Sequence, residues 1–352
     1  MLLFQVGFAP WCGAGHQVLI EEGAGVGSGI RDEDFRAAGA VLCPREEVFG
    51  NSELIMKVKE PLPQEWPLLR PGQILYAFLH LAAAPELAHA LLERQVSAIA
   101  LETIQTADGA LPLLVPMSEI AGRMAIHVGA KCLEKASGGR GVLLSGVPGV
   151  EPGRVAIVGG GIVGRNAARL ACGMGAEVTL LDINLERLRA IDDIFRGRVK
   201  TLISHPEHLQ AAVTEADLVI GAALVPGART PHLIDRAMVR QMQPGAVLVD
   251  VSIDQGGCAE TSRPTTHSQP TYIVDGVVHY CVPNMPGAVA RTATYALANV
   301  TLPYALQLAN KGLRQALADD PALCKGLNLH RGQVTHPAVA ASLGLPYHPY
   351  HA

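Results

Sequence analysis

The 352-residue chain is poor in aromatic and charged residues and has no excess of basic ones. Aromatic residues make up 4% of it, charged residues make up 17%, and the formal net charge is −4. A chain without an excess of positive charge does not attract polyanions, so we expect no nucleic-acid partner. Because 49% of the residues are hydrophobic, the composition also excludes a disordered chain. A chain of this length favours two domains.

Paired cysteines are missing as well. The seven cysteines are scattered, odd in number and form no C-x-x-C pair: Cys12, Cys43, Cys132, Cys172, Cys258, Cys281 and Cys324. Such a set argues against a disulfide framework and against a zinc cluster. We therefore expect no metal, buried apolar cysteines and a reducing compartment, the cytoplasm.

Uninterrupted hydrophobic runs are also absent. The most apolar stretch, Gly72–Leu92, contains two histidines, a proline and a glutamate, and so falls short of the roughly 20 apolar residues that span a bilayer. Met1–Gly15 is apolar, but the first basic residue is Arg31, which makes it a weak match to a signal peptide. We expect no membrane partner.

What the chain does have, from about Arg154 onwards, is an alternation of apolar runs and helical patterns. The runs are Arg154–Val158, Ala176–Asp182, Asp217–Gly221 and Ala246–Val251, and Ile162–Gly173 is a helical stretch between the first two. Continuous apolar runs of this length indicate parallel strands that are buried on both faces. The segment is therefore predicted to form a doubly wound sheet.

Further elements flank this segment on both sides. Strand-like runs are Gln17–Ile20, Leu54–Val58, Gly72–Leu79 and Ala98–Glu102, and helical patterns are Pro85–Glu93 and Thr292–Lys311. The fold class that this order favours is α/β, with a Rossmann-type doubly wound parallel-sheet domain at residues 113–290. That domain is inserted into a discontinuous second α/β domain, residues 1–112 and 291–352, and we expect the active site in the cleft between the two.

Residues 159–164 read GGGIVG, directly after the first apolar run and directly before a helix. In a dinucleotide site, Gly159 permits the tight turn, Gly161 lets the backbone approach a pyrophosphate, and Gly164 lets the helix pack on the strand. Asp182 ends the second run about 20 residues later, where a carboxylate accepts hydrogen bonds from a ribose. A glycine-rich turn without a nucleotide is the alternative.

Asp182 also bears on the choice of cofactor. A carboxylate at this position repels a 2′-phosphate, and the next two residues, Ile183 and Asn184, supply no positive charge to bind one. Arg187 lies further on, where we expect it at most to flank the adenosine. The sequence therefore favours NAD over NADP.

Six stretches around this fingerprint indicate a family. They are Met56–Pro61 (MKVKEP), Gln73–Leu81 (QILYAFLHL), Glu102–Met117 (ETIQTADGALPLLVPM), Gly146–Pro152 (GVPGVEP), Val249–Cys258 (VDVSIDQGGC) and Asn284–Pro286 (NMP). In this order and at these intervals they resemble the alanine dehydrogenases, relatives of the α subunit of the proton-pumping nicotinamide nucleotide transhydrogenase. The resemblance runs from about Gly15 to the C-terminus. It implies NAD-dependent conversion of L-alanine to pyruvate and ammonia, and a homohexamer.

The resemblance also implies that Lys59 holds the substrate and that His80 and Asp254 are the acid–base pair. Histidine suits proton transfer near neutral pH, an aspartate assists it, and a lysine can bind a carboxylate or polarise a carbonyl. Taken singly, His80 would more often be a core histidine, Lys59 a solvated lysine, and Asp254 a cap of the turn at Gly256.

The fingerprint and the resemblance together assign the following residues to the NAD site: Ser118, Gly159, Gly161, Ile162, Val163, Gly164, Asp182, Arg187, Ser204, Ala223, Leu224, Val251, Ser252, Ile253, Asp254, Arg263, Val282, Pro283, Asn284 and Met285.

One part of the family pattern has no counterpart. Members begin with a strand and a K-E-x-x-x-x-E-x-R-V-A-L-T-P stretch, whose arginine grips the substrate carboxylate, and Met1–Pro10 stands at the end of that region. A charge-assisted contact of this kind contributes about 1.5–3 kcal/mol, or roughly ten- to a hundredfold in binding. We therefore expect the chain as given to bind NAD but to show a strongly raised KM for alanine and pyruvate, or no activity.

Two other readings remain open. One is a transhydrogenase α-type or saccharopine-type dehydrogenase, against which the SIDQGG and NMP stretches and His80 argue. The other is an NAD-binding relative that is catalytically impaired because it lacks the arginine.

Overall fold

The computed structural model of the chain describes residue 11 and residues 13–223 and 230–351. The expectations for Met1–Pro10 and Leu224 concern positions outside these ranges. Among the helices of the described residues, none is long and apolar enough to cross a membrane.

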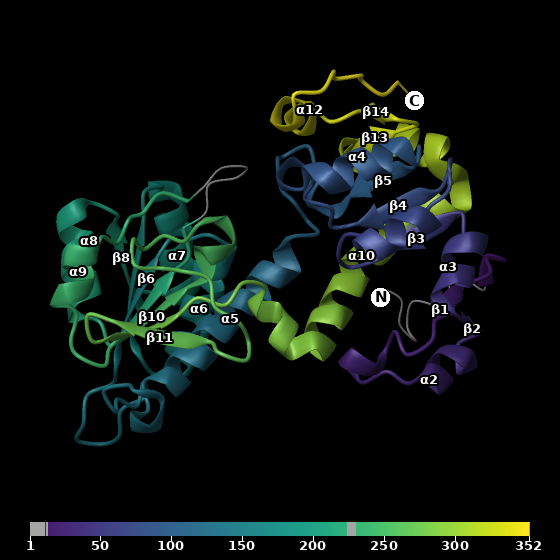
Figure 1. Ribbon diagram of the computed structural model, residues 1–352. Helices are drawn as coiled ribbons and strands as arrows, with labels where there is room; N and C mark the ends of the chain where they lie inside the picture. Colours follow the sequence, from purple (N-terminus) through teal and green to yellow (C-terminus); the bar gives the residue numbers. More distant parts are fainter. Residues whose placement is uncertain (1–10, 12, 224–229, 352) are drawn as a thin grey trace. The chain divides into compact units, whose positions relative to one another are not determined.

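The chain forms two compact units, whose elements are labelled in Figure 1. Unit 1 combines Met1–Pro116 with Val289–Ala352, and unit 2 is the continuous segment Met117–Ala288. Each unit has its own main sheet.

Unit 2 holds a seven-stranded sheet in the order β11-β12-β10-β9-β6-β7-β8. Its strands are β6 (Arg154–Val158), β7 (Glu177–Asp182), β8 (Val199–Ile203), β9 (Leu218–Gly221), β10 (Val247–Asp250), β11 (Thr271–Val274) and β12 (Val277–Tyr280). All neighbours pair in parallel except β11 and β12. The chain runs outward from the central β6 through β7 and β8, and then in the other direction through β9, β10 and β12. This is the order of doubly wound dinucleotide-binding sheets, so the Rossmann-type fold is confirmed.

Apolar residues cover both faces of this sheet. Its helices are α5 (Val115–Cys132), α6 (Ile162–Gly173), α7 (Leu185–Phe195), α8 (Pro206–Glu215) and α9 (Arg236–Gln241). On one face, Val219 packs in a cluster with Leu209 and Val213 of α8. The adjacent Leu218 points to the opposite face, where its side chain lies against Gly129 of α5. Burial on both faces explains why the strands are continuous apolar runs.

Unit 1 holds a five-stranded sheet in the order β14-β13-β5-β4-β3 and a separate parallel pair, β1 with β2. The strands are β1 (Leu19–Glu21), β2 (Val41–Cys43), β3 (Leu54–Met56), β4 (Ile74–Ala77), β5 (Ser97–Ala100), β13 (Leu327–His330) and β14 (Gln333–Val334). Strands β3, β4 and β5 are parallel, whereas β13 comes from the far end of the chain and pairs antiparallel with β5.

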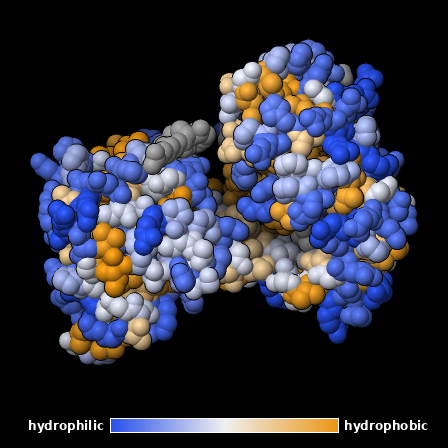
Figure 2. All heavy atoms as spheres, in the orientation of Figure 1, coloured by the Kyte–Doolittle hydropathy of each residue, from blue (hydrophilic) through white to orange (hydrophobic). Residues whose placement is uncertain are grey.

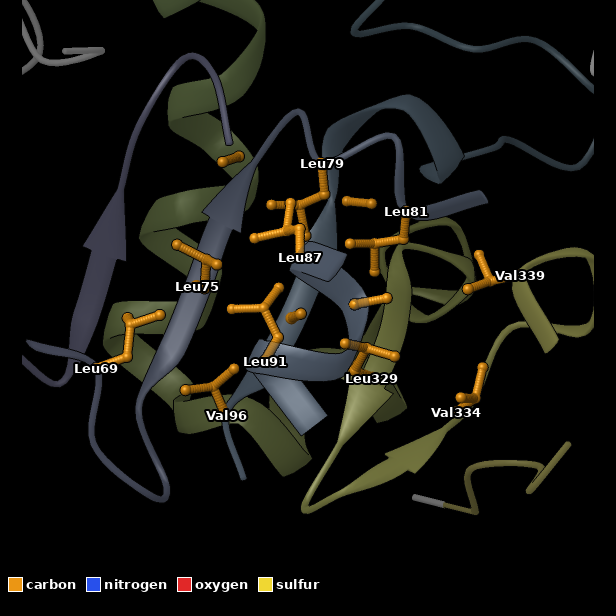
Figure 3. Packing of buried hydrophobic residues seen from close by; sticks show 14 of the residues in the cluster. Leu69, Leu75, Leu79, Leu81, Leu87, Leu91, Val96, Leu329, Val334 and Val339 are labelled. Carbon is orange, nitrogen blue, oxygen red and sulfur yellow. The ribbon is translucent and has the colours of Figure 1, made fainter. Parts of the chain in front are cut away.

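Helices pack on both faces of the five-stranded sheet as well. The helices of unit 1 are α2 (Asp32–Ala37) and α3 (Arg45–Asn51), which contact the β1–β2 pair, and α4 (Pro85–Glu93), α10 (Ala290–Asp319), α11 (Pro321–Lys325) and α12 (Pro337–Leu343). On one face Leu87 and Leu91 of α4 pack in a cluster with Leu75 of β4 (Figure 3). On the other face Tyr76 donates from its hydroxyl to the carbonyl oxygen of Thr301 on α10, at 3.1 Å.

Candidate active site

The carboxyl ends of three neighbouring parallel strands in unit 1 carry the first group of candidate residues. Beyond β3 and β4 the pairing continues, because Phe78 N–H donates to the carbonyl oxygen of Val58 at 3.1 Å. Lys59 and His80 therefore follow adjacent strands, and Glu102 follows β5. In open α/β sheets ligands bind outside the carboxyl ends of the strands. The sheet thus brings together Lys59, His80 and a carboxylate to which the sequence analysis assigned no role.

Glu102 fixes the backbone that carries His80. Its Oε1 accepts the N–H of His80 at 2.6 Å, and its Oε2 accepts the N–H of Leu79 at 3.2 Å. His80 has a left-handed backbone, with φ 48°, and its Nδ1 lies 4.0 Å from Oε1 of Glu102. The His80 side chain is 50% exposed whereas that of Glu102 is 13% exposed, so the imidazole faces solvent with a carboxylate behind it.

This arrangement corrects one predicted boundary. The run Ala98–Glu102 was expected to be a strand throughout, but β5 ends at Ala100 and Leu101–Thr103 form a 3-10 turn. The turn brings the Glu102 carboxylate to the two N–H groups. The signal that could have identified this residue is an acidic side chain directly after the third of three parallel strands.

Two further contacts define the surroundings of this group. The ring of Phe78 stacks on that of His80, with centroids 6.1 Å apart. Burial lowers the pKa of His336, and the negative charge of Glu102 opposes that shift.

The lysines of the MKVKEP stretch differ in their partners. Lys57 forms an ion pair with Glu65, a buried carboxylate that also accepts the N–H of Leu62 at 2.7 Å. Lys59 is exposed and has no ion-pair partner among the residues that the structure describes. Its ammonium is therefore the one in this stretch that can meet a ligand.

In unit 2 the fingerprint turn has the geometry that a dinucleotide needs. A Cβ at Gly164 would lie 1.8 Å from the carbonyl oxygen of Gly159, so only glycine lets the helix pack here. Gly159 has φ 108°, and a Cβ there would lie 2.6 Å from the carbonyl oxygen of Ala222. Around Gly161, by contrast, the space is open to 4 Å, and α6 begins without a side-chain cap. The N–H groups of this helix start, which no side chain caps, fit a pyrophosphate.

Asp182, at the end of β7, is engaged within the protein. Its Oδ2 accepts the N–H of Gly160 at 2.6 Å and a guanidinium N–H of Arg187 at 2.9 Å, and its Oδ1 accepts the N–H of Asn184 at 2.8 Å. Arg187 was expected at most to flank the adenosine, and its ion pair with Asp182 was not predicted. Gly160 was not predicted as a site residue either; a Cβ there would lie 2.8 Å from Cδ1 of Ile191 and 3.2 Å from Oδ2 of Asp182.

The carboxyl ends of the other strands in this sheet carry more of the candidates. Ser204 N–H donates to the carbonyl oxygen of Asp182 at 3.0 Å, which places it beside β7. Ser252 donates from its hydroxyl to the carbonyl oxygen of Ala223 at 2.5 Å. Asp254 accepts the N–H of Asn284 at 3.3 Å, which joins the segments that follow β10 and β12.

A buried carboxylate supports these segments. Asp250 is fully buried and accepts the N–H groups of Ser252, Cys258 and Ala259 and the hydroxyl of Ser262, at distances of 2.6–3.1 Å. It therefore shapes the turn that presents Asp254.

Other cofactor candidates lie in several parts of unit 2. The Arg263 guanidinium lies 4.2 Å from the ring centroid of Tyr272, and Ser118 lies in the first turns of α5. Ile253, Val282 and Met285 are buried. Lys59 and His80 belong to unit 1, whereas Asp254 and the cofactor candidates belong to unit 2. The cleft between domains therefore stays a prediction.

Comparison with known proteins identifies the family. The model of the alanine dehydrogenase/PNT N-terminal domain matches residues 8–121, and that of the C-terminal domain matches residues 125–337. The chain belongs to the alanine dehydrogenase family. The resemblance drawn from the sequence motifs is confirmed.

Individual relatives agree with this. Alanine dehydrogenase of Methanococcus maripaludis is 59% identical over 96% of this chain and 91% of its own length. Alanine dehydrogenase of Bacillus subtilis is 57% identical over 95% and 89%. A solved L-alanine dehydrogenase structure superposes with a TM-score of 0.95 at 51% identity, covering 97% of this chain and 95% of that one. Matches of this kind do not favour the transhydrogenase, saccharopine-type or impaired alternatives.

Proposed function

We propose that this chain is an NAD-dependent alanine dehydrogenase. It converts L-alanine, water and NAD⁺ into pyruvate, ammonium, NADH and a proton, and it catalyses the reverse reductive amination. The observation that carries the proposal is the group Lys59, His80 and Glu102 at three neighbouring strand ends, in a chain whose other unit holds a dinucleotide fingerprint. When bound, the nicotinamide accepts the hydride from the α-carbon of alanine.

The chain's own residues handle charge and protons. Lys59 holds the substrate carboxylate or polarises the carbonyl oxygen of pyruvate. His80 and Asp254 take the proton from the substrate ammonium and from the water that adds to the imine, and return one to the departing ammonia. Glu102 is a positioning residue in this proposal, because its carboxylate accepts the backbone N–H groups of Leu79 and His80.

The cofactor of this proposal is NAD. The open space around Gly161 admits a pyrophosphate, and the carboxylate of Asp182 rejects the 2′-phosphate of NADP. The residues that we assign to the cofactor are those named from the sequence, and we take unit 2 as the nucleotide domain and unit 1 as the substrate domain.

The proposal includes a homo-oligomer, a hexamer, in the cytoplasm. The described cysteines are all free, which suits a reducing compartment.

Three large apolar side chains in the segment before β6 are exposed and are available for subunit contacts: Leu143, Val147 and Val150. On the face drawn in Figure 2, hydrophobic groups are separated by hydrophilic ones. Light scattering coupled to size-exclusion chromatography measures the mass, and a monomer would contradict the hexamer.

The activity is tested by incubating the purified chain with L-alanine and NAD⁺ and following the absorbance of NADH. We expect turnover with L-alanine, little with D-alanine, and a strong preference for NAD⁺ over NADP⁺. Asp254→Asn is the comparison variant, in which turnover should be lower by about 10²–10⁴. No NADH from the purified chain under these conditions would contradict the proposal.

A further inference from the structure

The carboxylate of Asp182 has little acceptor capacity left for a ribose. A carboxylate offers about four lone-pair sites. Gly160, Asn184 and Arg187 occupy three of them, and the side chain is only 4% exposed. A ribose diol presents two hydroxyl groups. Two bonds to Asp182 therefore require that the Arg187 bond be given up or shared.

Arg187 is the exchangeable partner of the three. The bonds from Gly160 and Asn184 come from backbone N–H groups that the fingerprint turn and the start of α7 hold in place. The Arg187 side chain is 48% exposed, and Asp182 is its ion-pair partner. The neighbouring acid on the same helix, Glu186, pairs with Arg189 instead.

We propose that Arg187 is a specificity-determining residue whose positive charge Asp182 neutralises. This inference rests on the proposed NAD site. While the pair is intact, the carboxylate repels a 2′-phosphate and the guanidinium is occupied. Removal of the carboxylate frees a guanidinium at the ribose, and guanidinium groups bind phosphates through two parallel hydrogen bonds. The chain thus contains a cation for NADP that it keeps neutralised.

The test is a double-mutant cycle on the full-length chain, with the Kd of NADH and of NADPH measured by fluorescence titration. We expect Asp182→Ala to weaken NADH binding and to tighten NADPH binding by roughly ten- to a hundredfold, the size of a charge-assisted contact. We expect Asp182→Ala with Arg187→Met to lose most of that NADPH gain. The control is Asp182→Ala with Arg189→Met, which removes an exposed arginine of the same helix and should keep the gain.

Asp182→Asn covers the case in which the alanine variant does not fold. Its carboxamide oxygen can still accept the N–H of Gly160, while the charge that holds Arg187 is gone. The same NADPH gain, and its dependence on Arg187, is expected. An NADPH gain that survives Arg187→Met, or no gain in either Asp182 variant, would overturn the inference while leaving NADH binding by the parent chain intact. A parent chain that binds no NADH overturns the proposed function and this inference together.

Discussion

Replacing Glu102 tests whether this carboxylate sets the position of His80. The left-handed backbone of His80 costs about 1–2 kcal/mol. The bonds from Glu102 to the N–H groups of His80 and Leu79 are charge-assisted, each contributing about 1.5–3 kcal/mol. Together the two hydrogen bonds contribute more than the left-handed backbone of His80 costs.

The size of the effect follows from the acceptor that remains. Glu102→Gln keeps one acceptor oxygen, which at the place of Oε1 reaches the N–H groups of both His80 and Leu79. The remaining neutral bonds contribute about 0.5–1.5 kcal/mol each, roughly equal to the strain, so the turn becomes marginal. Since 1.4 kcal/mol is about a factor of ten, we expect kcat to fall about tenfold in Glu102→Gln. In Glu102→Ala, which has no acceptor, the fall should be about a hundredfold or more.

The assay is steady-state reductive amination of pyruvate, together with the Kd of NADH and the thermal unfolding temperature. Because the cofactor candidates lie in unit 2, the Kd of NADH should change little. Glu86→Gln, an exposed carboxylate on α4, is the matched control and should behave as the parent chain. A Glu102→Ala variant with ordinary kcat would refute the positioning role. Equal losses of kcat and of NADH affinity would mean that the substitution unfolds the protein.

Three further predictions follow from the geometry. His80→Ala and Asp254→Asn should each lower turnover by about 10²–10⁴, with the Kd of NADH retained in the His80 variant, and near-normal turnover of either would remove it from the acid–base pair. Gly164→Ala should abolish NADH binding, because its Cβ would lie 1.8 Å from a carbonyl oxygen of the fingerprint, whereas Gly173→Ala in the same helix has open space and should be neutral or stabilising. Burial lowers the pKa of His279 below its usual value of 6.5, so between that lowered pKa and about 6.5 the unfolded chain binds more protons than the folded chain, and the free energy of unfolding should fall as the pH drops through this range. Urea unfolding at several pH values measures this, and His279→Asn should flatten the dependence; an unchanged slope would contradict it.

The features that could be read from the sequence are local or periodic. The glycines of residues 159–164 are required by contacts within one strand–helix turn, so their spacing alone predicts the turn. The apolar runs of unit 2 predict buried parallel strands, because burial on both faces removes the alternation of polar and apolar residues. The position of Asp182 at the end of the second apolar run could also be predicted from the sequence. The roles of Lys59, His80 and Asp254 came from the resemblance and stay predictions.

Only the tertiary structure determines which of these residues meet one another. The carboxylate of Glu102 reaches the backbone of His80 because β4 and β5 pair in parallel and in register, which makes their carboxyl ends adjacent. The pairing of Asp182 with Arg187, and the crowding that keeps position 160 a glycine, depend on how α7 packs beside β7. The pairing of β13 with β5 joins segments from opposite ends of the chain. These contacts depend on strand register and helix packing, to which residues distant in the chain contribute, so no local pattern in the sequence encodes them.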